Sequence, residues 1–383
     1  MKRRILLACA LGASITSALA IEAPQPSTTD PAPEVQSQDP SVVPNDETQF
    51  YRVLQRSAHH RNLVGLKISP AVTDMLASGD IAGAIFALSA QSSSGNNDAN
   101  IALVRIQHWC NRFAMARVPD AQTQITKLPA RLAPERAARA AGVIIAEEKY
   151  RQVARDSCAR AQFDYVGIET RLREAAEKGD AASLTELSVF TRDAVRRQEM
   201  LQAAADKGFA PAQYALATSR LIAVQRGETT ENVASIRLLL KQAGRSLNKA
   251  KVDLANCMAI GCDGHPADTA AATQFGIDAA RDGEPGAFIS MARMSWGMRM
   301  DRAQLLAWQY FGDRLSEAGC VGEGYVAATV MFDQTIKTLE RQFPTAVERA
   351  RSLAETLWRD HGERAMREQG CSPPRDRLPA GAR

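Results

Sequence analysis

The residues with the clearest chemical potential in this chain are its seven cysteines. Cys9 lies near the amino terminus, and the other six are Cys110, Cys158, Cys257, Cys262, Cys320 and Cys371. Cysteine can attack a substrate or bind a metal as a thiolate, pack as a buried thiol, or form a disulfide. An even set of cysteines in an oxidising compartment favours disulfides. All six are therefore disulfide candidates, and free buried thiols are the alternative.

The segment CMAIGCDGH contains the pair that we expect to bond first. Cys257 lies near the end of a predicted helix and Cys262 lies in the following turn, so the short gap can bring the two sulfur atoms together. His265 makes a zinc site the alternative, because zinc takes Cys and His ligands. No second Cys or His pair lies nearby to complete four ligands, so we expect no metal.

A second pair, Cys110 and Cys158, lies on two long helical segments, 97–118 and 133–163. If these helices pack as antiparallel neighbours, a disulfide can join them. His108 lies close to Cys110, which also suggests a thiol nucleophile with a neighbouring base. An oxidising compartment and an available partner cysteine favour the disulfide.

The five histidines give little support for catalysis. The chain has no HExxH helix, no GxSxG turn and no glycine-rich phosphate loop. His59 and His60 could act as a base or as a ligand pair, but adjacent residues on a helix do not face each other. The sequence therefore predicts a protein that is not an enzyme and that holds no cofactor.

The segment 1–20 has the pattern of an export signal. Lys2, Arg3 and Arg4 precede a short apolar run, and small residues end at Ala20, so we expect cleavage between Ala20 and Ile21. The apolar run is too short for a membrane-spanning helix. A lipidated Cys9 is the alternative, although the apolar stretch before it is very short. We expect a soluble periplasmic protein.

Removing the signal changes the charge of the chain. The net charge of +4 falls to +1, because three basic residues and no acids are lost. A nearly neutral chain has no electrostatic basis for binding nucleic acid. The sequence therefore favours a protein or an envelope component as the partner.

Composition and repeats predict an all-α fold. The chain is rich in alanine, its aromatic content is 5%, and 383 residues exceed one compact core. Residues 21–46 and 371–383 are polar and proline-bearing, which predicts a disordered linker and a disordered tail. Between them we expect a divergent helical region over 47–165 and a helical repeat region over 166–370.

The repeat region shows the same local pattern at several places. AAEKGDAASLTEL, AADKGFAPAQYAL and AARDGEPGAFISM share an alanine pair, a glycine and an apolar helix start. Ala212, Ala250 and Ala287 are 38 and 37 residues apart, and Gly283 and Gly319 are 36 apart. The period of 36 to 38 residues is the length of a two-helix solenoid unit. We expect Gly208, Gly244 and Gly283 to end helices with positive φ. In ENVASIRLLLKQAG, apolar residues spaced by three and four predict one buried helix face.

Residues 261–292 resemble a Sel1-like repeat, a relative of the tetratricopeptide repeat. The resemblance rests on a turn with Gly264, Pro266 and Asp268 and on an Ala-Ala-x-x-Gly link over 279–283. It is weaker in the other units and covers about 166 to 340. The resemblance implies a right-handed α-solenoid with a divergent helical cap at its amino-terminal end.

The same resemblance implies a non-catalytic adaptor that binds its partner through the repeat surface. The alternative is an envelope enzyme, related to the cell wall or to β-lactams, with a site in the amino-terminal helical region. Trp, Tyr and Arg dominate protein interfaces, so we looked for them on helix positions expected to be exposed. The interaction candidates are Gln213, Tyr214 and Arg220 at such positions, together with Trp296 and Trp308, for which a place in the core is the alternative.

Overall fold

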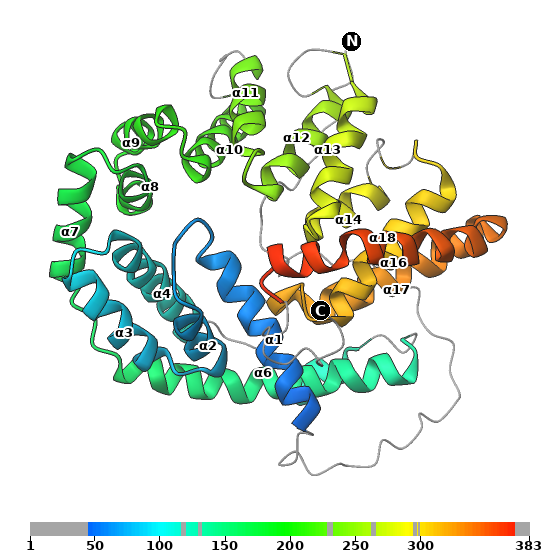
Figure 1. The fold of residues 1–383 in the computed structure, drawn as a ribbon, viewed down its shortest axis with the longest axis horizontal. Helices are drawn as coiled ribbons and strands as arrows, with labels where there is room; N and C mark the ends of the chain where they lie inside the picture. The colour runs from blue at the N-terminus through cyan, green and yellow to red at the C-terminus, as the bar shows by residue number, and fades with distance from the viewer. Residues whose placement is uncertain are drawn as a thin grey trace.

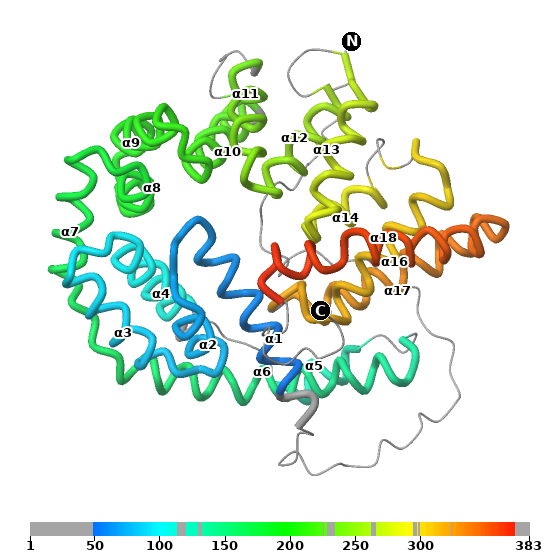
Figure 2. Tube along the Cα trace, in the orientation of Figure 1, coloured from blue at the N-terminus to red at the C-terminus, as the bar shows by residue number. Residues whose placement is uncertain are grey.

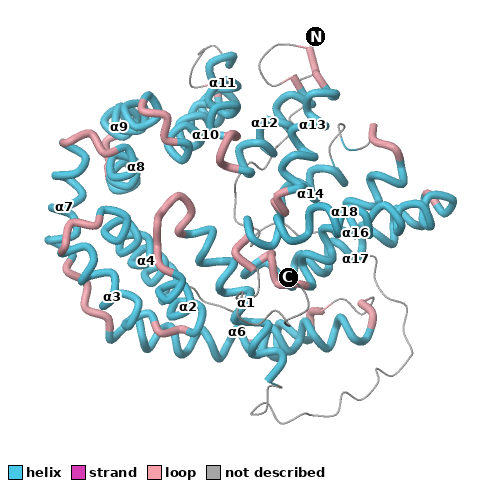
Figure 3. The backbone as a smooth tube through the Cα atoms, in the orientation of Figure 1, coloured by secondary structure: helices cyan, strands magenta, loops and turns pink. Residues whose placement is uncertain are grey.

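The computed structural model describes residues 45–115, 120–128, 132–227, 233–261, 266–293, 297 and 299–371. Within these ranges the chain is built from helices and the turns that join them, and Figure 3 shows no strand. The amino-terminal helices are α1 (Asn45–Asn62), α2 (Pro70–Ser78), α3 (Ile81–Ser93), α4 (Asn97–Met115), α5 (Ala121–Thr126) and α6 (Pro134–Arg160). The predicted all-α fold is confirmed.

A series of mostly shorter helices follows α6 and makes up the rest of the chain. They are α7 (Tyr165–Glu177), α8 (Ala181–Phe190), α9 (Ala194–Asp206), α10 (Ala210–Arg226), α11 (Val233–Ala243), α12 (Asn248–Ile260), α13 (Thr269–Arg281), α14 (Pro285–Arg293), α16 (Arg302–Glu317), η1 (Gly322–Gly324), α17 (Tyr325–Gln342), η2 (Pro344–Ala346) and α18 (Val347–Glu368). Helices that follow each other in the sequence pack together, and the pairs stack into an α-solenoid.

The same two residue types begin and end many of these helices. Asp164 and Asp180 accept hydrogen bonds from backbone N–H groups in the first turns of α7 and α8, which satisfies donors that the helix leaves free. Gly208 and Gly283 have positive φ directly after α9 and α13, as predicted. Gly244 does not adopt positive φ, so that prediction was wrong, and it lies in the turn after α11.

The buried apolar residues form two large clusters and two small ones. One large cluster lies mainly among α1–α4, α6, α7 and α8, and the other lies among α10–α18. Between them, the clusters around α8–α12 are small and rich in alanine. On α11, Ile236, Leu240 and Ala243 are fully buried, which confirms the predicted apolar face. The middle of the array therefore has the thinnest core.

The first and last parts of the described chain pack against each other. In Figure 1 and Figure 2 the helices follow a curved path around α1, with the long helix α6 along one side. Helix α1 contacts α2, α6 and η1, and α6 also contacts α17. We call the contacts of α1 and α6 with the segment from α16 to α18 the closure contacts. Sequence reasoning gave no indication of them.

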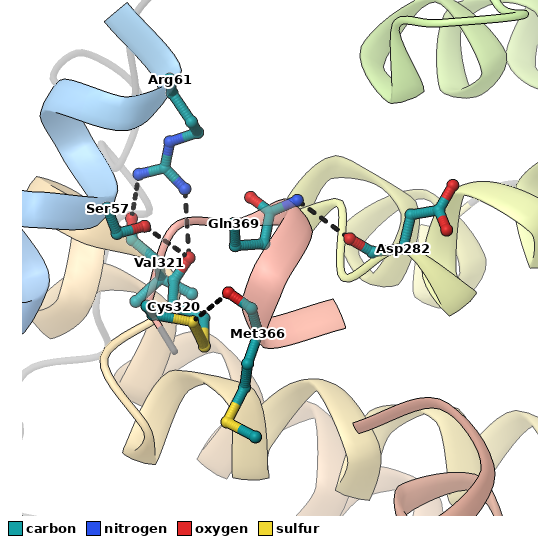
Figure 4. Close-up of a disulfide and its surroundings, with 8 residues drawn as sticks. Ser57, Arg61, Asp282, Cys320, Val321, Met366 and Gln369 are labelled. Carbon is teal, nitrogen blue, oxygen red and sulfur yellow. Dashed lines mark hydrogen bonds between the residues drawn. A yellow bond between two sulfur atoms is a disulfide. The ribbon is translucent and has the colours of Figure 1, made fainter. Parts of the chain in front are cut away.

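One part of the closure contacts surrounds the Cys320–Cys371 disulfide, which joins the end of α16 to the end of α18 (Figure 4). Ser57 Oγ donates to the carbonyl oxygen of Cys320 at 3.1 Å. Arg61 donates to the carbonyl oxygens of Cys320 and Val321 at 3.2 and 2.7 Å. The disulfide thus lies next to the carbonyl groups that α1 binds.

A glycine is required where α1 meets the end of α18. Gly370 has a φ of 67°, and a Cβ atom there would lie 2.5 Å from Cβ of His60. Any larger residue would therefore be strained and would separate the two helices.

A second part of the closure contacts is ionic. Arg136, in the first turn of α6, pairs with Asp313 and with Glu317 of α16, and its Nη1 lies 3.6 Å from Asp333 of α17. Arg139 reaches Glu317 at 2.5 Å. Apart from Arg139, these side chains are mostly buried, between helices that lie about half the chain apart in sequence.

Several predictions fall on residues outside the described ranges. They concern the export signal with its cleavage at Ala20, the linker up to residue 44, and the tail after residue 371. Helix α1 begins at Asn45, two residues before the predicted start of the helical region. Cys371 itself is bonded to Cys320 and is not part of a free tail. Among the described helices, none combines the length and the apolar character needed to cross a membrane.

Candidate interaction groove between α7 and α9

A large cavity lies between α7 and α9, with a volume of about 670 Å³. Helices α7 and α9 both pack on α8, and neither packs closely on the other. Helix α8 and part of α4 form the floor. The residues that line the cavity are Val104, Gln107, Tyr165, Ile168, Glu169, Leu172, Arg173, Ala176, Glu177, Leu184, Leu187, Phe190, Thr191, Arg192, Asp193, Arg196 and Met200. We call this the α7–α9 groove.

Polar residues of α4 hold the floor and one wall of the groove in place. Asn97 Nδ2 donates to Asp180 at 2.8 Å, which fixes the start of α8. Asn100 Nδ2 donates to the carbonyl oxygen of Ile168 in α7 at 3.2 Å. Arg105 forms an ion pair with Glu186 of α8 at 2.6 Å, and both side chains are largely buried. Helices α7 and α8 are therefore fixed to the large amino-terminal core.

The other wall is much less covered. Residues 192–199, which include the first half of α9, are all exposed. Val195 is 68% exposed. The α9 helix becomes buried only from Leu201 onward, where it packs in the small alanine-rich cluster. The first half of α9 therefore has exposed side chains on every face.

Apolar residues line the floor and the mouth of the groove. Ile168 and Leu172 of α7 and Leu187 of α8 are buried at the floor. Two aromatic residues at the mouth, Tyr165 and Phe190, are 54% and 46% exposed. Large exposed aromatic residues beside an apolar floor are typical of a surface that binds another molecule.

Charged residues line both walls of the groove. On α7 these are Glu169, Arg173 and Glu177, and the first two form an exposed ion pair at 2.5 Å. On the α9 side they are Arg192, Asp193 and Arg196, of which Asp193 caps α9 and Arg196 pairs with Glu199. Glu177 and Arg192 have no ion-pair partner among the described residues. The groove thus carries acidic and basic groups that are not all neutralised within the chain.

The interaction residues predicted from sequence lie elsewhere, and neither Gln213 nor Arg220 is exposed as expected. Gln213 is 6% exposed and donates to the carbonyl oxygen of Ala205 at 3.2 Å, so it holds α10 against α9. Trp308 is 5% exposed and packs against Phe311, which confirms the alternative of a place in the core. Arg220 is half-buried and donates to Gln202. Trp296 lies outside the described residues.

The fourth described candidate, Tyr214, belongs to a smaller cavity of about 190 Å³ between α10, α11 and α12. Its hydroxyl donates to Asp253 at 2.7 Å, and Lys249 Nζ lies 5.5 Å from its ring. Burial raises the pKa of Asp253 and of nearby Glu284 above the usual carboxyl range. Tyr214 is half-buried and bonded within the fold, so its expected exposure was also wrong.

The histidines and cysteines singled out in the sequence do not converge. His59 is 2% exposed beside Trp109 and lies 3.0 Å from the Tyr150 hydroxyl, and burial lowers its pKa to about 4. His60 lies on another side of α1, as expected for adjacent helix positions. Cys110 is bonded to Cys158, as predicted, so it is not a free nucleophile.

The remaining cysteine prediction is only half described. Cys257 is buried at the end of α12, whereas Cys262 and His265 lie outside the described residues. The Cys257–Cys262 bridge therefore remains a prediction. Within the described residues no group of three or more Cys, His, Asp or Glu side chains could hold a metal ion.

Sequence reasoning missed the groove because its aromatic residues lie at helix ends. Tyr165 begins α7 and Phe190 ends α8, so neither contributes to an apolar repeat along a helix. One local pattern could have indicated these two residues. Each is a large apolar residue close to an aspartate that caps a helix, at Asp164 and Asp193.

Comparison with known proteins gives a limited result. No family model matches the chain, and no curated protein matches it. One solved structure with similarity is a protective antigen present in uropathogenic Escherichia coli strains that displays an SLR fold. It is 13% identical, with a TM-score of 0.31, and the match covers 86% of this chain and 81% of that chain.

Proposed function

We propose that this protein is an exported, non-catalytic scaffold of Sel1-like repeats that binds another protein through the α7–α9 groove. The observation that carries the proposal is the groove itself, with an apolar floor fixed on α4 and a wall, the first half of α9, that is exposed on every face. An exposed helix half beside two exposed aromatic residues is a surface that gains from being covered.

Two further observations support the exported location. The segment 1–20 has the pattern of an export signal, which gives a mature chain beginning at Ile21. The described residues contain two disulfides, Cys110–Cys158 and Cys320–Cys371, and disulfides persist in oxidising compartments such as the periplasm.

Site-specific photocrosslinking tests the binding function. The purified chain carries a photoreactive phenylalanine analogue at position 190 in one sample and at position 86 in the other. Phe86 is the matched control, because it is 80% exposed on α3 and does not line the groove. With envelope extract from the source cells, we expect a discrete adduct from position 190 that position 86 does not give.

Competition then shows whether the groove surface itself is recognised. Excess unlabelled wild-type chain should remove the adduct, whereas the chain with Tyr165→Ser and Phe190→Ser should not. The proposal fails if both positions give the same adducts, if neither gives one, or if the double variant competes as well as the wild type.

A further inference from the structure

We infer that the partner segment bound in the α7–α9 groove is an amphipathic α-helix with basic residues along one edge and acidic residues along the other. This inference rests on the proposed binding function and specifies the chemistry of the partner. It follows from the length of the groove, the nature of its surfaces and the charges on its two walls.

The walls set the length and the form of the occupant. The groove-lining residues of α7 run from Tyr165 to Glu177, a length of about 20 Å at about 1.5 Å per residue, whereas α9 lines the groove only up to Met200. A helix of three to four turns spans that length. The described surfaces of the groove are helical, so they offer no unpaired strand edge to which an extended peptide could add. A helix forms its backbone hydrogen bonds within itself, so it can bind in such a groove without a neighbouring strand.

The floor requires an apolar stripe on that helix. Its aliphatic side chains, Ile168, Leu172, Leu184 and Leu187, lie along α7 and α8, and Met200 of α9 closes one side. Methionine is flexible and adapts to the shape of an inserted side chain. The two aromatic residues at the mouth can cover the stripe once it is inserted.

The wall charges specify the two edges of the helix. Arg192 and Arg196 outnumber Asp193 among the groove-lining residues on the α9 side, so this side faces an acidic edge. Arg196 pairs with Glu199 at exposed positions, and Arg192 has no ion-pair partner among the described residues. On α7, Arg173 is already paired with Glu169, and Glu177 has no ion-pair partner among the described residues, so this wall faces a basic edge. The spacing of four residues between Glu169, Arg173 and Glu177 matches the repeat of side chains along a packed helix.

Three synthetic helical peptides, each of about four turns, test the inference by fluorescence anisotropy with the full, disulfide-bonded chain. All three carry the same leucine stripe. One has lysines on one edge and glutamates on the other, one has lysines on both edges, and one has glutamates on both edges. We expect the mixed peptide to bind about tenfold more tightly than either of the others.

Charge reversal on one wall should change this preference. With Arg192→Glu and Arg196→Glu, both walls become acidic, so the peptide with lysines on both edges should bind most tightly. The matched control is Arg359→Glu with Arg367→Glu on α18, which changes the net charge equally at exposed sites outside the groove. The control should keep the preference for the mixed peptide.

The inference is overturned if the mixed peptide does not bind, if it has no advantage, or if the reversed wall leaves the preference unchanged. A fourth peptide with residues 21–44 tests whether this proline-bearing segment of the chain occupies the groove instead. If it displaces the mixed peptide and binds more tightly, the occupant is a segment of the chain itself. Any of these results leaves the crosslinking result at Phe190 unaffected, so the two proposals fail separately.

Discussion

The α7–α9 groove and the closure contacts use charged side chains in opposite ways. At the closure contacts, Arg136 is 21% exposed and has three carboxylates within 4 Å. Beside the groove, Arg173 and Arg196 are 63% and 68% exposed and pair only with neighbours on their own helices. The ion pairs of the closure contacts thus connect helices that are distant in the sequence, whereas those of Arg173 and Arg196 join residues of one helix. The described chain is therefore held together where its first and last helices meet, and it is open along the exposed first half of α9.

The largest effect should come from removing the disulfides. The two bridges close loops of nearly equal size, with sequence separations of 48 and 51. The chain-entropy model therefore gives each about 4 kcal/mol of the free energy of unfolding. We expect Cys110→Ala with Cys158→Ala, and Cys320→Ala with Cys371→Ala, to lower that free energy by similar amounts in urea unfolding.

The two double variants should differ in their local effect. Loss of Cys320–Cys371 should increase hydrogen exchange at the end of α1, because Ser57 and Arg61 donate to carbonyl groups beside that bridge. Loss of Cys110–Cys158, which joins α4 to α6, should not. Equal exchange at α1 in both variants would show that the disulfide does not support the closure contacts.

The next effect should come from Arg136→Ala. This change leaves Asp313, Glu317 and Asp333 near one another with less positive charge, in a largely buried place. We expect a loss of about 2–3 kcal/mol in urea unfolding, below the range for fully buried pairs because the site is partly solvated. Arg136→Lys should recover part of the loss. A change below about 0.5 kcal/mol, as for an exposed pair, would mean that the ionic contact does not hold the closure.

A third effect is the pH dependence caused by His59. Its pKa is about 4 in the folded chain and near 6.5 in the unfolded chain. As the pH falls below 6.5, the unfolded chain takes up a proton that folded His59 does not, so stability present above that pH is lost on the way to pH 4. The slope of about 1.4 kcal/mol per pH unit gives a loss of about 2 kcal/mol at pH 5.

The variant His59→Gln isolates this effect. The Tyr150 hydroxyl donates to the carbonyl oxygen of Leu76, so it can accept from the side-chain amide of the variant as it does from the imidazole. We expect a smaller fall in stability between pH 7 and pH 5 for the variant than for the wild type. Identical pH profiles in urea unfolding would show that His59 is not held neutral.

The smallest effect should come from Arg173→Ala in the groove wall. Its pair with Glu169 joins exposed groups one helical turn apart, and such pairs contribute less than about 0.5 kcal/mol. We expect almost no change in urea unfolding. A loss similar to that of Arg136→Ala would remove the distinction between an open groove and a fixed closure.

Sequence reasoning predicted the local features of the fold well. Helix ends at Gly208 and Gly283 follow from backbone hydrogen bonding near each residue. The Cys110–Cys158 bridge could also be predicted, because two long neighbouring helices limit where each cysteine can lie.

The interaction surface and the closure contacts could not be predicted from the sequence in the same way. Gln213 looked like an exposed polar residue, but its amide satisfies a carbonyl group between α9 and α10. Arg61 and Val321 are 260 positions apart, and nothing near either residue indicates that they meet. The groove exists because α7 and α9 do not pack closely on each other, and no local sequence pattern indicates which helices remain apart.

The closure contacts also set the order in which this chain can fold. An open array of repeats can form from either end and grow one unit at a time, but the closure contacts of α1 need the carbonyl groups of Cys320 and Val321. Until the turn after α16 is in place, the hydrogen bonds from Ser57 and Arg61 to those carbonyl groups cannot form, so the amino-terminal helices exist first as an unfinished structure. A truncation that removes α16–α18 would make that state permanent.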